Sequence, residues 1–223
     1  MRLALRSMVV SCALVFAAIP AHATPIDVRV LSATFTATVT VAQGADTQTE
    51  TATNSDPVSK SLYREYCNDI FMCAFADADA TAGLLDVSAT GYSFFADAVA
   101  NADSEWTFSP LWGGVAYIDI VGDNNFIEAW QSASLFDVTS NEQVWYFYSN
   151  RYDLGISETV PTLLNADHVY VMHLNAFAAG RGDGTWSNLR VSGIRAVPDN
   201  VDSFVCLYIG LLAALLAKWQ LRT

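Results

Sequence analysis

Histidine is the first residue type to consider for acid–base or metal chemistry, and two histidines lie well inside this chain. His168 and His173 are five positions apart. On a β-strand, residues separated by an odd number of positions point to opposite faces, so these two cannot bind one metal ion from a regular strand. We therefore expect each of them to be a structural hydrogen-bonding residue.

Carboxylates are numerous, with 23 Asp and Glu among 223 residues, so a pair for glycoside hydrolysis can always be drawn. Such a pair needs two carboxyl groups about 5–10 Å apart across a cleft. Glu105, Glu128 and Glu142 are the candidates, because they fall among strand-like segments. Solvated charges on outer faces explain them better. The sequence contains no H-E-x-x-H, G-x-S-x-G or phosphate-loop pattern, so we expect no catalytic residues, and a secreted hydrolase is the least favoured hypothesis.

A run of oxygen-bearing side chains raises the question of calcium. Asp119, Asp123, Asn124 and Asn125 could offer hard oxygen ligands at the end of a strand. Their spacing does not match an EF-hand loop, and Gly-Asp-Asn is ordinary turn chemistry. We favour a turn over a calcium site, and we expect neither a cofactor nor a metal site.

Aromatic residues are better candidates for binding. Five tryptophans lie between the two ends of the chain: Trp106, Trp112, Trp130, Trp145 and Trp186. Rings on an exposed sheet face can stack against the flat apolar faces of sugars, although a sandwich core also needs large rings, and we expect most of these in the core. Trp112 follows Pro110 and precedes two glycines, so it should be the most exposed. Trp112 and Trp130 are the candidates for sugar binding.

These side chains must be positioned by β-strands, because no sustained helical period occurs between the two ends. Residues 34–41 alternate strictly between threonine and an apolar residue, which is typical of a half-buried strand. Strand-like runs also cover residues 84–99 with a break at Gly91, and residues 115–121, 126–136, 144–148, 168–177 and 185–196.

The segments between these runs contain turn and loop signals. Residues 122–125, 140–141 and 180–184 read as turns. We expect a polar loop over residues 43–61 and an irregular connection over residues 63–75. Short strands at regular spacing predict an all-β fold, a single β-sandwich over residues 24–196, most simply jelly-roll-like.

The N-terminal segment has the charge and length of a secretory signal peptide. Arg2 and Arg6 precede an apolar core over residues 8–19, and Ala21-His22-Ala23 forms a small-residue cleavage site. The core is too short for a membrane anchor, and the apolar stretch before Cys12 is too brief for a lipoprotein signal. We therefore expect residues 1–23 to be a signal peptide and the protein to be exported.

The expected export of the chain bears on the oxidation state of its cysteines. Cys12 leaves with the signal peptide and Cys206 lies in the C-terminal segment, so Cys67 and Cys73 remain as a pair. In an oxidising compartment they should form a disulfide. A metal site or a catalytic dithiol is less favoured, because the C-x5-C spacing has no second Cys/His pair and is not C-x-x-C.

The C-terminal segment, residues 197–223, combines a short polar motif, an apolar run and a basic end. Val197, Pro198 and Asp199 precede an apolar run over residues 204–217, which Lys218 and Arg222 follow. The run would span a membrane only marginally, with its basic end in the cytoplasm. A buried core helix is the alternative, because runs of this length are ambiguous.

This C-terminal pattern resembles the PEP-CTERM family of sorting signals, in the variant whose motif reads Val-Pro-Asp. The resemblance implies that Val197, Pro198 and Asp199 are the sorting motif and that the following helix anchors the chain transiently in the membrane. It also implies that an exosortase-like membrane protease cuts near the motif and that the body is released to the cell surface or beyond. It implies an exported β-sandwich and no particular activity.

The net charge of the chain between its two terminal segments, which we call the body, excludes some classes of binding partner. Of 11 basic and 23 acidic side chains, four basic and two acidic ones lie in residues 1–23 and 198–223. This leaves 7 basic and 21 acidic side chains in the 174 residues between them. Such an acidic body should repel nucleic acid and anionic membranes, and also anionic polysaccharides unless divalent cations bridge the charges. The sequence therefore predicts a non-enzymatic protein of the cell surface or exopolysaccharide matrix, with extracellular polysaccharide as a partner. The alternative is a carbohydrate-binding module that uses exposed aromatic rings.

Overall fold

A computed structural model describes residues 24–25, 28–67, 73–125, 128–150, 155–181 and 184–196 of this chain. The expected signal peptide, the expected sorting motif at Val197, Pro198 and Asp199, and the apolar run that follows lie outside these residues. In the part that is described, no helix is long and apolar enough to cross a membrane. The fold below is that of the compact unit formed by residues 25–195.

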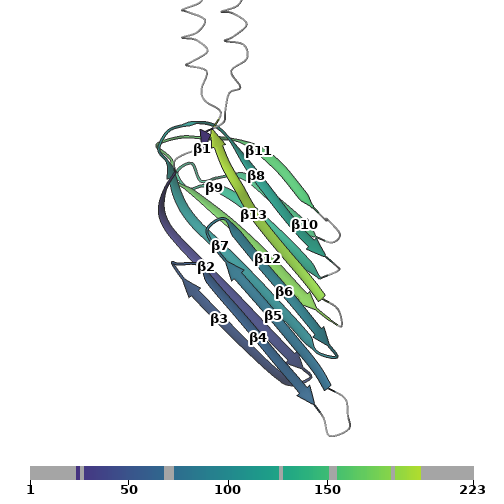
Figure 1. The fold of residues 1–223 in the computed structure, drawn as a ribbon. Coiled ribbons are helices and arrows are strands. Elements are labelled where there is room, and N and C mark those ends of the chain that lie inside the picture. Colours follow the sequence, from purple (N-terminus) through teal and green to yellow (C-terminus); the bar gives the residue numbers. More distant parts are fainter. Residues whose placement is uncertain are drawn as a thin grey trace, which may run out of the picture. The chain divides into compact units, whose positions relative to one another are not determined.

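The described residues are organised almost entirely as β-strands (Figure 1). In chain order the strands are β1 (Thr24–Pro25), β2 (Val28–Gln43), β3 (Asp46–Asn54), β4 (Val58–Cys67), β5 (Cys73–Ala82), β6 (Asp86–Phe94), β7 (Asp97–Pro110), β8 (Gly114–Asn125), β9 (Ala129–Asp137), β10 (Glu142–Asn150), β11 (Ile156–Leu164), β12 (Tyr170–Gly180) and β13 (Gly184–Ala196). The predicted all-β class is therefore confirmed.

The strands form two antiparallel sheets. The seven-stranded sheet has the order β11-β8-β13-β6-β5-β4, with β1 paired to β13. The six-stranded sheet has the order β10-β9-β12-β7-β2-β3. Strands β5 and β6 of the first sheet lie against β2, β7 and β12 of the second. The arrangement agrees with the expected β-sandwich, while the more specific jelly-roll topology stays a prediction.

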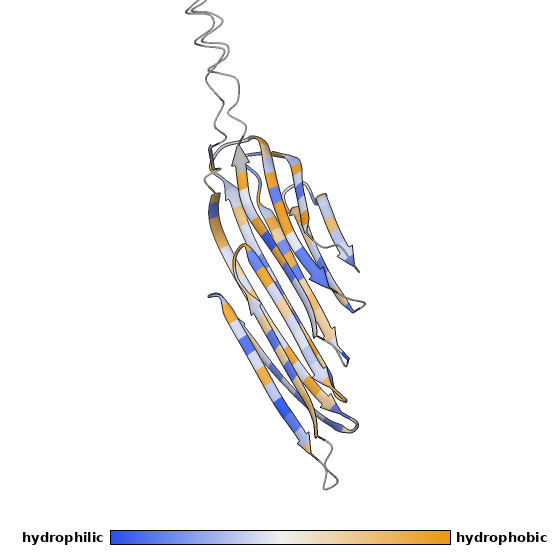
Figure 2. Ribbon diagram, turned by 45° about the vertical axis from the view of Figure 1, so that its right-hand side comes forward, coloured by the Kyte–Doolittle hydropathy of each residue, from blue (hydrophilic) through white to orange (hydrophobic). Residues whose placement is uncertain are grey.

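The alternating sequence explains which side chains enter the core. In β2, Phe35, Ala37, Val39 and Val41 are buried, and the threonines between them face outward. The same alternation runs through β5, β6 and β7, and Figure 2 shows it as hydrophobic and hydrophilic bands along the strands. A period of two places every second side chain on one face of a strand, so one face of each sheet packs inward.

Large side chains fill one part of the interior. Trp106, Phe108 and Tyr170 are almost completely buried and form a continuous series of ring contacts, with centroids 4.6 and 5.6 Å apart. These rings come from β7 and β12, which are paired in the six-stranded sheet. Aromatic pairs of this kind add about 1 kcal/mol beyond the burial of their area.

A second part of the interior is built from very small side chains, and we call it the alanine seam. Its members lie on β5, β6, β7 and β12, and none is more than 1% exposed: Ala76, Ala78, Ala80, Ala89, Ala98, Ala100, Ala102, Ala176 and Ala178. At Gly91 of β6 the sheets nearly touch through their backbones. A Cβ atom there would lie 2.7 Å from the carbonyl oxygen of Ala98 and 2.9 Å from the amide nitrogen of Gly180. Only small residues fit this close approach.

Two side-chain hydrogen bonds lie next to this close approach, one between the sheets and one within the seven-stranded sheet. The Ser93 hydroxyl donates to the carbonyl oxygen of Gly180 in the opposite sheet, at 2.8 Å. The Thr185 hydroxyl donates to the carbonyl oxygen of Gly91 at 3.1 Å. Both hydroxyls are buried, so these bonds satisfy polar groups that water does not reach.

Several expectations about loops were wrong. The polar residues 43–61, expected as a loop, contain β3 and the start of β4, and residues 63–75, expected as an irregular connection, belong largely to β4 and β5. Both β3 and β4 are edge strands, so they bury fewer side chains and can be polar. The expected break at Gly91 lies inside β6, and residues 122–125, expected as a turn, lie inside β8.

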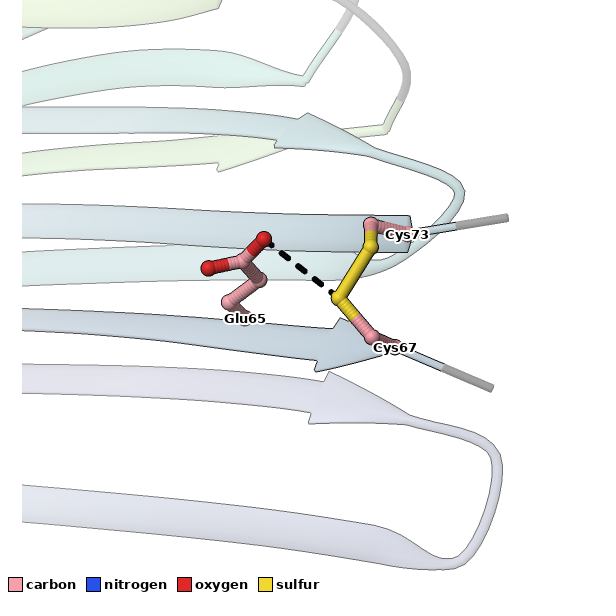
Figure 3. Close-up of a disulfide and its surroundings, with 3 residues drawn as sticks. All are labelled: Glu65, Cys67 and Cys73. Atoms are coloured by element: carbon pink, nitrogen blue, oxygen red, sulfur yellow. Dashed lines mark hydrogen bonds between the residues drawn. A yellow bond between two sulfur atoms is a disulfide. The ribbon is translucent and has the colours of Figure 1, made fainter. Parts of the chain in front are cut away.

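Cys67 and Cys73 form a disulfide at the end of the β4–β5 hairpin, as the sequence predicts (Figure 3). Cys67 is the last residue of β4, Cys73 is the first of β5, and they face each other in the register with Cα atoms 4.1 Å apart. The bridge closes a short loop, so the chain-entropy model assigns it only about 2 kcal/mol of stabilisation.

Candidate functional site

The outer face of the six-stranded sheet gathers aromatic, amide, acidic and hydroxyl side chains into three rows that run across β7, β12, β9 and β10. The register of the strands defines these rows. They are Asn101–Phe177–Trp130–Asn150, Asp103–Asn175–Ser132–Tyr148 and Glu105–His173–Ser134–Tyr146. Residues far apart in the sequence thus become neighbours on one surface.

Four rings from these three rows contact one another in series across β12, β9 and β10. We call this series, Phe177, Trp130, Tyr148 and Tyr146, the aromatic row. Trp130 stacks on Phe177 with ring centroids 5.4 Å apart and planes 17° apart. Tyr148 lies 6.2 Å from Trp130, and Tyr146 is stacked 6.5 Å from Tyr148. Tyr146 is 60% exposed and Tyr148 is 49% exposed, so the row offers ring surface to solvent. A pocket lined by Ser134, Phe136, Gln143, Trp145 and Tyr146 adjoins it.

Beside the aromatic row lies a set of hydrogen-bonded side chains, which we call the polar network. The amide of Asn175 donates to the carboxylate of Asp103 and to the side-chain oxygen of Asn101, and Asn101 also donates to Asp103. Nε2 of His173 lies 3.2 Å from Oδ1 of Asp103. The network is half-buried, so its side chains are held in fixed positions.

The electrostatics of the polar network favour a charged pair. Burial alone would raise the pKa of Asp103, but hydrogen bonds from His173, Asn175 and Asn101 outweigh it, so this pKa is lowered. The hydrogen bond to Asp103 raises the pKa of His173 despite the burial of the ring. The carboxylate therefore stays ionised at neutral pH and remains a strong hydrogen-bond acceptor.

Threonines on β2 and β3 extend the same face towards the edge of the sheet. Their hydroxyls pair across the strands at Thr36–Thr53, Thr38–Thr51 and Thr40–Thr49, with distances of 3.1, 3.2 and 3.0 Å. Each hydroxyl is both a donor and an acceptor. The face therefore passes from rings through amides and a carboxylate to a ladder of hydroxyl groups.

The two tryptophans that the sequence singled out lie in different settings. Trp130 is the centre of the aromatic row. Trp112 lies in the connection between β7 and β8, is 41% exposed, and does not belong to this face. Of the other tryptophans, Trp106 is in the core and Trp186 is exposed on the outer face of the seven-stranded sheet.

The two histidines each pair with an aspartate. Nδ1 of His168 lies 2.6 Å from Oδ2 of Asp137, at the junction between the turn after β9 and the start of β12. His173 belongs to the polar network on the outer face. The two rings thus lie in separate environments, and each has an acidic partner.

The remaining acidic and amide candidates lie on different strands and contact different partners. Glu128 pairs with Arg181 at 3.3 Å, whereas Glu142 begins β10 and Glu105 lies beside His173. Asp119 accepts a hydrogen bond from Thr159, at 2.8 Å.

Asn124 and Asn125 join neighbouring strands. The amide of Asn124 lies 3.4 Å from the Ser149 hydroxyl, and the oxygen of the Asn125 side chain accepts from the amide of Trp186 at 2.6 Å. Of the four residues considered for calcium, Asp119, Asn124 and Asn125 thus turn their side chains towards three different strands.

In the described residues, one cluster of three potential metal ligands occurs, formed by Glu65, Cys67 and Cys73 (Figure 3). Sγ of Cys67 lies 3.4 Å from Oε1 of Glu65. A disulfide sulfur has no proton to donate, so we describe this as a contact. In the disulfide neither sulfur is a thiolate, which is the form that binds metals.

Sequence reasoning missed most of the outer face. Phe177 and Tyr148 reach Trp130 through strand pairing, and Asp103 meets Asn175 in the same way. The only local signal was parity, since Tyr146 and Tyr148 share one side of β10. The order of the strands in the sheet supplies the rest.

Comparison with known proteins yields little. No family model matches this chain, and no curated protein matches it. Among solved structures, it is similar to the enzymatically active domain of tailspike protein 4 of bacteriophage CBA120, with a TM-score of 0.30 and 10% sequence identity. The match covers 64% of this chain and 19% of that chain, so this chain spans about a fifth of that length. A likeness at this level supports no conclusion about function.

Proposed function

We propose that this chain is an exported, non-enzymatic protein of the cell surface or exopolysaccharide matrix, and that it binds polysaccharide on the outer face of its six-stranded sheet. The observation that carries the proposal is the aromatic row of Trp130, Phe177, Tyr146 and Tyr148 beside the polar network around Asp103. The carbohydrate-binding role and the matrix role then belong to one molecule.

The chemistry of the face suits sugars. A pyranose ring has a flat apolar side that packs on aromatic rings and a rim of hydroxyl groups that need hydrogen-bond partners. The aromatic row provides the first, and the ionised Asp103 with its amide neighbours provides the second. Because Asn101, Asn175 and His173 already hold the carboxylate in place, little side-chain ordering is needed on binding.

The same network argues against hydrolysis at this face. A glycosidase needs a carboxylic acid whose pKa is raised so that it can protonate the leaving group. The pKa of Asp103 is lowered instead, and both of its oxygens accept hydrogen bonds. We therefore propose a binding role without catalysis.

Export and sorting complete the proposal and rest on the terminal segments. The signal peptide over residues 1–23 would direct export, and an exosortase-like protease would cut near Val197, Pro198 and Asp199. Intact-mass measurement on protein from the host's envelope and culture fluid tests this. We expect a species that begins at Thr24 and ends near Pro198, whereas a species that retains Thr223 would contradict the processing.

The binding face is tested by replacing its central ring. We expect Trp130→Ala to weaken binding to the host's own exopolysaccharide at least about fivefold, because a stacking contact of an aromatic ring contributes about 1 kcal/mol or more. The measurement is retardation of the protein in native gels that contain the polysaccharide. Trp112→Ala is the matched control, since that ring is exposed but lies off the face.

Two results would overturn the glycan-binding proposal. One is equal retardation of wild type and Trp130→Ala. The other is an equal loss of binding in Trp130→Ala and Trp112→Ala, because the face would then have no special role. Circular dichroism of each variant shows whether the fold is retained.

A further inference from the structure

The outer face of the seven-stranded sheet carries a second group of exposed aromatic residues, on β4, β5 and β6. Tyr63, Asp77 and Tyr92 lie side by side in the register of these strands. Phe75, two positions before Asp77 on β5, lies 5.3 Å from the ring of Tyr92 and 6.0 Å from that of Phe94. We call these five residues the tyrosine–aspartate patch.

The turn next to the patch holds a strained aromatic residue. Phe95 has a φ angle of 55°, which bulky residues rarely adopt, and its ring is 63% exposed. That ring lies 4.3 Å from the ring of Phe94, so it extends the patch beyond β6. A strained backbone that places an apolar ring in solvent is a recognised mark of a binding surface.

The charge of the patch is negative and uncompensated. Burial, followed by the negative charge of Asp79, raises the pKa of Asp77. None of the ion pairs in the described part of the chain involves Asp77 or Asp79. A carboxylate that is partly removed from water and has no cation beside it is stabilised by a cationic partner.

Charge complementarity excludes several occupants of the patch. In a symmetric dimer the same surface faces itself, so Asp77 and Asp79 of the two copies would oppose each other. An anionic membrane surface would also be repelled. The aromatic rings, in contrast, attract cations to their faces.

We propose that the tyrosine–aspartate patch binds a polysaccharide that carries free amino groups, such as a glucosamine-containing polymer. This inference rests on the proposed matrix function, because it takes the partner to be an extracellular glycan. Sugar rings would stack on Tyr63 and Tyr92, which are two strands and therefore about 10 Å apart. The ammonium group of an intervening sugar would pair with Asp77, which lies between them.

The consequence is a module with two different glycan faces. One face, on the six-stranded sheet, would hold sugars through the aromatic row and the polar network. The other, on the seven-stranded sheet, would hold amino sugars through rings and a carboxylate. Such a module would cross-link two polysaccharide chains.

Isothermal titration with the hexamer of β-1,4-linked glucosamine tests the patch, using protein recovered from the host. We expect Asp77→Asn, which keeps the shape of the side chain, to weaken binding at least about tenfold through loss of the charge-assisted contact. Glu142→Gln, which removes an exposed carboxylate from the other sheet and away from both glycan faces, should leave the affinity within about twofold. This control separates the patch from the general attraction of an acidic protein for a polycation.

Three outcomes would overturn the inference. They are unchanged binding by Asp77→Asn, equal binding of the N-acetylated hexamer, and equal binding of hexalysine, which would make a cationic protein segment the occupant. Trp130→Ala should leave glucosamine binding unchanged. The failure of this inference is therefore distinguishable from that of the proposed function, which is read from Trp130→Ala on the host's exopolysaccharide.

Discussion

Replacing Gly91 with alanine is expected to destabilise the domain by about 3 kcal/mol, the upper range for overpacking a close-packed interior. The new methyl group would lie 2.7 Å from the carbonyl oxygen of Ala98 and 2.9 Å from the amide nitrogen of Gly180. Both atoms belong to the backbone of the opposite sheet, so neither can rotate away. The sheets must separate along the alanine seam, and many small contacts are then lost together.

Gly184→Ala is the matched control for this prediction. A Cβ atom at Gly184 would meet the ring of Tyr92 at 3.2 Å, and that side chain is exposed and able to move. We expect a loss below about 1 kcal/mol for this variant, the range of most surface changes. Urea unfolding followed by tryptophan fluorescence gives both values. Equal losses in the two variants would show that the sheets do not approach as closely at Gly91 as described.

Removing the carboxylate of Asp137 should cost about 3 kcal/mol, because this buried group accepts hydrogen bonds from three partners. Its Oδ1 accepts from the backbone amides of Thr139 and Ser140, at 2.9 and 3.1 Å, and its Oδ2 lies 2.6 Å from Nδ1 of His168. The amide of Val138 also donates to the carbonyl oxygen of Val169. One carboxylate therefore joins the turn after β9 to the entry of β12.

The effect of Asp137→Ala should depend on pH in a defined direction. Burial would raise the pKa of Asp137, but hydrogen bonds from His168 and from the Ser140 amide lower it overall. A carboxyl group with a lowered folded pKa contributes stability above its unfolded pKa of about 3.9 and loses it as the pH falls through the folded value. The difference between wild type and variant should therefore be full at pH 7 and narrow below about pH 4.

Glu142→Ala is the control for Asp137→Ala. Glu142 faces Asp137 in the same hairpin and is exposed, so its loss should change stability by less than about 0.5 kcal/mol. Denaturant unfolding of wild type and both variants across the pH range provides the comparison. A difference that grows on acidification would contradict the assigned direction of the pKa shift.

The sequence predicted the strands whose two faces differ. Residues 34–41 lie in β2, residues 144–148 in β10 and residues 168–177 largely in β12, because strict alternation and aromatic content are local properties. Strands β3 and β4 were missed because edge strands bury few side chains and resemble polar loops. The turn expected at residues 122–125 was wrong because Asn124 and Asn125 bond to neighbouring strands, and local composition does not reveal these partners.

The candidate site was predictable only in part, and for a similar reason. Trp130 could be singled out by residue type, but nothing near it in the sequence indicates Phe177, which reaches it through the pairing of β9 and β12. Asp103 and His173 are 70 positions apart, and each alone resembles an ordinary polar residue. Their proximity depends on the order of the strands in the sheet. A series of short strands is compatible with several such orders, so the sequence alone does not reveal it.

The alanine seam also bears on how the domain responds to temperature. The heat capacity of unfolding rises with the apolar area that becomes exposed, and an alanine side chain exposes little. A seam packed through methyl groups therefore contributes less to this quantity than a seam of leucines would. A smaller heat capacity flattens the curve of stability against temperature. A domain built in this way would keep its fold over a broad range of temperatures, cold as well as warm, without being exceptionally stable at any one of them.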